Sequence, residues 1–200
     1  GKVIEFYPGQ MLTKEERNIK WSHDASDEVV ARVKEKLAKH GVRAVNYGVV
    51  GIPKDEAAAR KVFEFAKKLG LYGITTESVD ALDTAEKLAK EYDIRVAVHN
   101  HGIKSTYGNP NTVQNILRHR DERLGVCLDL GWITAAGFDA AKVYKDYNGR
   151  VFDLHLKDKR IEKVKEGDDV DVGCHVVGDG EHALVGVRHR VGGTGPVEHR

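Results

Sequence analysis

Four polar residues stand at the ends of short apolar runs, and their types suit the binding of a divalent cation. Glu77 follows GITT, His99 follows VAV, Asp129 follows VCL, and His155 lies within FDLHLKD. Carboxylates and imidazoles are common protein ligands of Mg²⁺, Mn²⁺ and Zn²⁺. A barrel of parallel strands brings the carboxyl ends of its strands to one mouth, where such side chains can meet. The pattern predicts a metal-dependent enzyme that acts on a small polyhydroxylated molecule.

The segments that lead to these residues alternate between strand and helix patterns. Runs of β-favouring residues begin near residues 3, 43, 72, 95, 124 and 151, at spacings of 23 to 40 residues. Between them, apolar residues recur at three- and four-residue steps, which is typical of amphipathic helices. We expect helices from Asp24 or Ser26 to about residue 40, from Pro53 to about 69, between Glu77 and about 92, from Pro110 to about 117, and over about 139–147.

Consecutive right-handed strand–helix units form either an open doubly wound sheet or a closed barrel. An open nucleotide-binding sheet usually has a glycine-rich phosphate loop after its first strand, and GVVG at 48–51 lacks the helix-opening glycine pattern. Candidate ligands at four strand ends also favour a barrel. We therefore predict an α/β fold, a (β/α)₈ TIM barrel that is incomplete in this sequence, as a single domain over residues 1–200.

The alternating pattern is regular to about residue 160 and degrades over 161–200. We expect a loop over 162–172, a short helix over 183–190 and the stub of a last strand at Val197–Glu198. The prediction of a complete set of strands therefore weakens toward the C-terminus.

Composition and charge exclude several classes of protein. Of 200 residues, 32 are Lys or Arg and 31 are Asp or Glu, so a net charge of +1 gives no broad field that favours nucleic acid or an acidic membrane. Cys127 and Cys174 are too few for a disulfide scaffold or a zinc ribbon. No apolar run approaches the roughly 20 residues of a membrane span. We expect a cytoplasmic protein, and export with a signal removed before Gly1 is the alternative.

A series of short motifs follows in a fixed order: IEFYPGQ (4–10), VNYGVVGIP (45–53), FEFAKKLG (63–70), Glu77 at a strand end, EKLAKEYDIRVAVHNHG (86–102), NPNTV (109–113), CLDLGW (127–132) and LHLKD (154–158). Together these motifs resemble the sugar phosphate isomerase/epimerase proteins of the xylose-isomerase-like barrel superfamily. The resemblance spans Val3 to Asp158, with a weaker match at 178–180 and 195–198. No single motif is specific, and the order and spacing give the resemblance its weight.

The resemblance implies a (β/α)₈ barrel in which the strand near Val3 is the second of eight and Glu198 ends the eighth. The first strand–helix unit and the last helix are then not evident in this sequence. A barrel that lacks a strand has two unpaired edges. We expect either a longer natural chain trimmed at both ends or an incomplete barrel sealed by a partner, a homo-oligomer included.

Related enzymes of this superfamily bind manganese, magnesium or zinc through two glutamates, an aspartate and a histidine at strand ends. By position, the resemblance assigns Asp129, His155, Glu198 and Glu77 as metal ligands. A structural hydrogen bond between Asp129 and His155 is the alternative for that pair. For Glu77, the alternative is a charge that complements the N-terminal dipole of the following helix.

The fifth strand on this numbering ends in His99-Asn100-His101, where the best-known epimerases place a carboxylate. His99 and His101 share one face of the strand, and we expect one of them to replace that ligand or to contact the substrate. Lys157 is expected either to bind a substrate oxygen or to neutralise Asp129 and Glu198. Trp132 is expected to wall the substrate pocket, with plain packing as the alternative.

The implied reaction is removal of a proton next to a carbonyl, with a metal-stabilised enediolate and Glu77 and Glu198 as the proton-transferring pair. Return of the proton to the same carbon gives epimerisation, and return to the neighbouring carbon gives isomerisation. One alternative is a dehydratase of an inosose or a dehydroshikimate-like acid. Another is a non-catalytic, degenerate carbohydrate-binding barrel. A related abasic-site endonuclease would need more metal-binding histidines and a basic DNA-facing rim.

Overall fold

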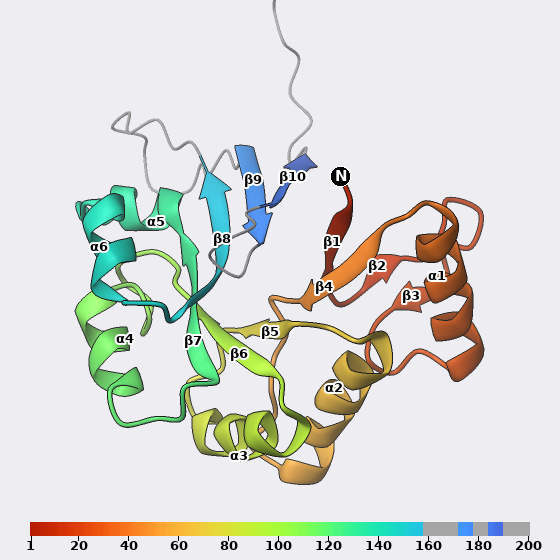
Figure 1. The fold of residues 1–200 in the computed structure, drawn as a ribbon, viewed down its shortest axis with the longest axis horizontal. Coiled ribbons are helices and arrows are strands. Elements are labelled where there is room, and N and C mark those ends of the chain that lie inside the picture. Colours follow the sequence, from red (N-terminus) through yellow and green to blue (C-terminus); the bar gives the residue numbers. More distant parts are fainter. Residues whose placement is uncertain (158–171, 178–183, 190–200) are drawn as a thin grey trace, which may run out of the picture.

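A curved sheet with helices on its outer side forms the centre of the protein (Figure 1). The computed structural model describes residues 1–157, 172–177 and 184–189. The strand order in the sheet is β1-β4-β5-β6-β7-β8-β9-β10. Its first six strands are all parallel: β1 (Val3–Phe6), β4 (Arg43–Tyr47), β5 (Gly73–Thr76), β6 (Arg95–His99), β7 (Leu124–Asp129) and β8 (Val151–Lys157).

The predicted alternation of strand and helix is confirmed over these six strands. The helices that connect or follow them are α1 (Asp27–Lys39), α2 (Glu56–Leu69), α3 (Leu82–Tyr92), α4 (Pro110–Leu117), α5 (Leu130–Ala135) and α6 (Ala140–Asp146). The short helix α5 and a hairpin of β2 (Gln10–Met11) and β3 (Lys20–Trp21) were not predicted. Parallel strands with helices on the outer face make this the sheet of a TIM barrel, as expected from the sequence.

Side-chain caps decide where the first two helices begin. The Ser26 hydroxyl accepts from the backbone N–H of Val29, which confirms a start for α1 near this residue. The predicted start of the second helix at Pro53 is wrong. Helix α2 begins at Glu56 because the Asp55 carboxylate accepts from the backbone N–H of Ala58. None of the helices in the described part of the chain is long and apolar enough to cross a membrane.

The segment after β8 departs from the predicted pattern. The expected helix over 183–190 is wrong, because residues 184–189 form strand β10 (Leu184–His189), antiparallel to β9 (Val172–Val177). Strand β9 in turn runs antiparallel to β8. The β-branched Val185 and Val187 around Gly186 favour an extended chain over a helix. The predicted strand stub at Val197–Glu198 lies outside the described residues.

The two faces of the sheet bury different kinds of side chain. On the outer face, apolar residues of the strands and helices form the main core, with Tyr47, Phe63, Ile74, Leu88 and Leu128 almost fully buried. The inner side holds buried polar groups, which are Asn46, Thr75, His99, Asp129, Asp153 and His155. Burial of so many polar groups is costly unless they bond one another. The barrel interior is therefore the place to look for chemistry.

Candidate metal centre

The four successive parallel strands β5 to β8 bring four polar side chains together at or near their ends. These are the carboxylates of Glu77 and Asp129 and the imidazoles of His99 and His155. The central residue is His99, at the end of β6. Its Nδ1 lies 2.7 Å from Glu77 Oε1, and its Nε2 lies 3.0 Å from His155 Nδ1 and 3.6 Å from Asp129 Oδ2. Parallel strands place all of these ends at one edge of the sheet. The sequence predicted this gathering from strand ends alone.

Burial separates these residues into an inner group and an outer one. The side chains of Asp129, His99 and His155 are only 0%, 4% and 5% exposed, whereas that of Glu77 is 43% exposed. The Glu77 carboxylate contacts the nitrogen of His99 that faces away from Asp129 and His155. Glu77 therefore lies at the mouth, and the other three lie below it.

Hydrogen bonding fixes which nitrogen of His99 carries a proton. The contact with His99 lowers the pKa of Glu77 below its usual value, so this carboxylate is ionised at neutral pH. An ionised carboxylate only accepts hydrogen bonds, so His99 Nδ1 must donate to it. The other ring nitrogen, Nε2, faces Asp129 and His155.

Asp129 is ionised although it is fully buried. Burial raises the pKa of this carboxyl, but the contacts with His99 and Lys157 outweigh burial and lower the pKa to about 2. Lys157 Nζ lies 2.8 Å from Asp129 Oδ2. The other oxygen accepts from the backbone N–H of Trp132 at 3.1 Å and caps α5. Of the two roles expected for Lys157, neutralisation of Asp129 is thus observed.

Asn100 fixes the strand end that bears Asp129, a role the sequence analysis did not assign to it. Its Oδ1 accepts from the backbone N–H of Asp129 at 2.8 Å, and its Nδ2 donates to the Asp129 carbonyl at 3.2 Å. Asn100 directly follows His99, so it points away from the imidazole and across to β7. This pair of bonds holds β6 and β7 in register at the mouth.

A second polar layer lies on the deeper side of His155, and sequence reasoning missed it. His155 Nε2 is 3.4 Å from Glu5 Oε2 and 3.5 Å from Asp153 Oδ2. Asn46 Nδ2 lies within hydrogen-bond distance of Glu5 Oε1 and Asp153 Oδ2, both at 3.0 Å, and of Thr75 Oγ1 at 2.6 Å. The sequence did contain a signal for this layer, because side chains two residues apart on a strand share one face. Asp153 and Thr75 lie two residues before His155 and Glu77, and so face the same side as these residues.

This deeper layer sets the charge of His155. Burial by itself lowers the pKa of an imidazole, but Asp153 and Glu5 outweigh burial and raise the pKa of His155 to about 10. Burial and the neighbouring Asp153 raise the pKa of Glu5. In the metal-free protein His155 therefore carries a positive charge, and an ion bound at Nδ1 would displace the proton of that nitrogen.

Pairs of donors in this group have the chemistry and the spacing of ligands to a divalent ion. Donors that share one tetrahedral ion at about 2.0–2.1 Å lie about 3.3 Å apart. The 3.0 and 3.6 Å separations around His99 Nε2 bracket that value. Potential donors of His99, Cys127 and His155 also lie within 4.8 Å of one another, as do those of Glu5, Asp153 and His155. Burial raises the pKa of the Cys127 thiol well above its usual value, which disfavours the thiolate that a metal needs.

Two hollows open beside this group of donors. One, of about 290 Å³, is lined by Glu77, Val79, His99, His101, Lys104, Ser105, Thr106 and Tyr107. The other, of about 280 Å³, lies between the 101–105 loop and α5 and is lined in part by Trp132. The His101 and Trp132 rings are 4.2 Å apart between centroids, and Lys157 Nζ is 5.9 Å from the Trp132 ring. The predicted substrate-binding residues thus surround the mouth, while Glu198 lies outside the described residues and its role stays a prediction.

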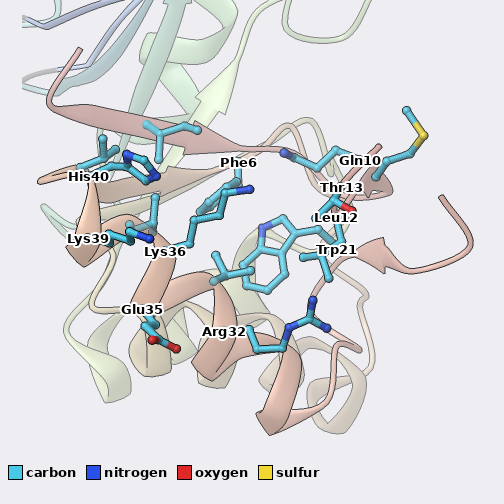
Figure 2. Close-up of a pocket in the computed structure, with 15 residues that line it drawn as sticks. Phe6, Gln10, Leu12, Thr13, Trp21, Arg32, Glu35, Lys36, Lys39 and His40 are labelled. Carbon is cyan, nitrogen blue, oxygen red and sulfur yellow. The ribbon is translucent and has the colours of Figure 1, made fainter. Parts of the chain in front are cut away.

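A larger cavity, of about 700 Å³, lies elsewhere in the molecule (Figure 2). It lies between β1, the β2–β3 hairpin and α1, and its walls include Phe6, Leu12, Trp21 and Leu37. Its lining contains none of the four strand-end residues at the mouth. Size therefore does not identify the site of chemistry in this protein.

Comparison with known proteins finds one matching family model and related dehydratases. The family model of the xylose isomerase-like TIM barrel matches residues 73–195. An inosose dehydratase of Clostridium perfringens is 34% identical over 88 residues, which are 44% of this chain and 29% of that protein.

Solved structures show the same fold. An uncharacterised protein from Parabacteroides distasonis superposes with a TM-score of 0.64 at 29% identity, covering 74% of this chain and 60% of the other. A sugar phosphate isomerase/epimerase from the same organism gives 0.57 at 14% identity, covering 84% and 68%. The chain thus spans less than two thirds of the length of the first of these proteins and matches less than a third of the dehydratase.

Proposed function

Since a family model matches more than half of its residues, the chain belongs to the xylose isomerase-like TIM barrel family, and from this premise we propose a specific reaction class. The protein catalyses metal-dependent isomerisation or epimerisation of a small sugar or sugar derivative, by removing a proton next to a carbonyl. The observation that carries this proposal is the position of His99 Nε2, 3.0 Å from His155 Nδ1 and 3.6 Å from Asp129 Oδ2.

His99, Asp129 and His155 would hold the ion, with Glu198 as the fourth ligand that the family resemblance implies. The ion, when bound, supplies a Lewis acid that favours negative charge on the carbonyl oxygen of the substrate. The support for this role is the donor set itself, which is buried and closely spaced and includes the ionised carboxylate of Asp129. Lys157 neutralises Asp129 and, being 14% exposed, can also reach a substrate oxygen.

Glu77 is suited to move the proton. Its carboxylate is ionised at neutral pH and faces the hollow at the mouth, where a substrate carbon can approach. The His99 N–H holds Oε1 in place, so the other oxygen can accept a proton from carbon. Trp132 offers an aromatic face to the apolar side of a sugar ring, and Glu198 is the proposed carboxylate on the opposite side of the substrate.

A second candidate, dehydration of an inosose or a dehydroshikimate-like acid, is favoured by one observation. Proteins named inosose dehydratase share 33–34% identity with this chain over 88 residues. A structural neighbour from Bacillus anthracis is named a probable 3-DHS dehydratase. Dehydration begins with the same proton removal and then expels a hydroxyl as water, so the same site could serve it.

Two assays on one sample test the proposal. The protein is stripped with a chelator, reloaded with Mn²⁺, Mg²⁺ or Zn²⁺, and incubated in D₂O with ketoses, aldoses and inososes, free and phosphorylated. Deuterium at the carbon next to the carbonyl, with a new epimer or isomer, is the expected result. Loss of water would favour the second candidate. A protein that binds none of these ions, or exchanges no carbon-bound proton on any substrate, would contradict the proposal.

A further inference from the structure

The His155 ring lies between two layers of polar groups, and its two nitrogens face different ones. Its Nδ1 faces His99 at 3.0 Å on the mouth side. Its Nε2 faces Glu5 Oε2 at 3.4 Å and Asp153 Oδ2 at 3.5 Å on the inner side. The two carboxylates are 9% and 1% exposed, so water has little access to them.

The two inner neighbours of Nε2 are both carboxylate oxygens, which accept hydrogen bonds when ionised. A ring nitrogen with an N–H is attracted to them, whereas a bare lone pair would be repelled by both. The inner nitrogen is therefore the one that keeps its proton.

Three hydrogen bonds from two other groups hold the inner carboxylates in place. Asp153 Oδ1 accepts from the backbone N–H of Leu154 at 2.8 Å, and its Oδ2 accepts from Asn46 Nδ2 at 3.0 Å. The same Asn46 amide donates to Glu5 Oε1 at 3.0 Å. Strands β1, β4 and β8 thus jointly fix the two oxygens, so their direction is set before any ligand arrives.

We propose that Asp153 and Glu5 are positioning residues that keep the proton of His155 on Nε2 and thereby aim Nδ1 at the mouth as a metal-binding nitrogen. This proposal rests on the proposed function, because it presumes that the mouth binds a divalent ion. It deepens that function by assigning roles to two buried carboxylates that do not themselves touch the ion or the substrate. Carboxylates that orient a metal-bound imidazole typically change metal affinity by roughly 10–100-fold when they are replaced.

The test follows the His155 ring by NMR in full-length protein labelled with ¹⁵N-histidine, first metal-free and then loaded with Zn²⁺. In the wild type, an Nε2–H signal of His155 that exchanges slowly with water is expected in both states. Asp153→Asn and Glu5→Gln should each speed up this exchange and weaken Zn²⁺ binding roughly 10–100-fold in a competition titration. Glu5 lies on the terminal strand β1. If Asp153→Asn does not fold, the exchange rate and the Zn²⁺ affinity of Glu5→Gln still test the proposal.

Val126→Ala is the matched control, because this buried residue of β7 packs in the main core and contributes no polar atom to either layer. It should lower stability but leave the Nε2–H signal and Zn²⁺ affinity unchanged. A wild type whose Nε2 bears no proton in the Zn²⁺-loaded state would overturn the proposal, as would variants with wild-type exchange and affinity. If the wild type binds no ion, the proposed function fails, and the exchange rates in the metal-free variants alone decide whether the carboxylates hold the ring.

Discussion

The side chain of Asn46 donates from Nδ2 to Asp153 Oδ2 at 3.0 Å, although the two residues are 107 positions apart in the sequence. Asn46 lies on β4 and Asp153 on β8, which are not neighbours in the sheet. The bond therefore crosses the barrel interior and ties its two sides together. The other partners of Asn46, Glu5 and Thr75, lie on β1 and β5, so one amide connects four strands.

Replacing Asn46 with Ala should destabilise the protein markedly. Two buried carboxylates would lose their shared donor, and a buried group left without its partner costs about 1–3 kcal/mol, more if it is charged. We expect a loss of roughly 2–4 kcal/mol in the free energy of unfolding, measured by urea denaturation. Asn115→Ala, at an exposed site on α4, is the control and should change stability by less than about 0.5 kcal/mol. Equal effects of the two variants would show that the interior network contributes little.

Gly125→Ala should also destabilise the protein, by overpacking the barrel. A Cβ at this position of β7 would overlap the Arg150 carbonyl and the Phe152 ring. Overpacking of this kind costs about 1–3 kcal/mol, which is several degrees in the melting temperature of a domain of this size. Gly51→Ala is the control, because a Cβ there meets nothing within 4 Å. A melting temperature of Gly125→Ala equal to that of the control would argue against this packing.

Lys157→Met should make the protein depend on metal for stability. Removing the cation leaves Asp129, which is 0% exposed, without its closest counter-charge, and breaking a buried ion pair costs roughly 3–5 kcal/mol. Thermal denaturation of the metal-free variant should show this loss, and added Zn²⁺ should raise the melting temperature of the variant more than that of the wild type. Lys142→Met breaks an exposed pair with Asp146 and should change little. An identical response of variant and wild type to Zn²⁺ would place the ion away from Asp129.

Glu77→Gln should separate proton transfer from metal binding. The amide can still accept from His99 but cannot take a proton from carbon, so deuterium incorporation should fall by roughly 10²–10⁴. Metal affinity should stay near that of the wild type, because Glu77 contacts the nitrogen of His99 that faces away from Asp129. Asp129→Asn should instead weaken metal binding strongly. If Glu77→Gln loses metal to the same extent, Glu77 is a ligand, as the family resemblance implies.

The free energy of unfolding should decrease at low pH, because protonation of Glu56 and Glu91 breaks their ion pairs with Arg60. Lys87 and Arg60 lower the pKa of Glu56 below 4.5, and Arg60 does the same for Glu91. A carboxyl with a lowered pKa in the folded state stabilises the fold above its ordinary pKa and loses this contribution as the pH falls below about 4.5. Arg60→Gln should therefore be less stable than the wild type at pH 7, and the difference should shrink by pH 3, in urea midpoints.

Lys61→Gln is the control for this pH series, because Lys61 is exposed on the same helix and no contact of its side chain is described. Its stability should follow that of the wild type at every pH. A difference between Arg60→Gln and wild type that is constant with pH would show that packing, and not charge, gives Arg60 its effect.

The mouth of the barrel could be predicted from the sequence because strand ends are local features. Glu77, His99, Asp129 and His155 each close an apolar run, and parallel strands must bring such ends to one edge. The six strands and the helices between them, except the short α5, follow from periodicity in the same way. The antiparallel strands β9 and β10 do not, because the repeating pattern is lost after residue 160.

The inner layer was decided by the tertiary structure. Glu5 in IEFY and Asp153 in FDLH read as ordinary polar positions, because the sequence does not say which strands lie opposite one another. Irregular register after Ile4 and after Val126 shifts the pairing of these strands by one residue, and such a shift changes which side chains face inward. Sequence alone thus determined which side chains reach the mouth, whereas the curvature of the sheet brought two buried carboxylates against His155, since contacts across the interior depend on curvature and register.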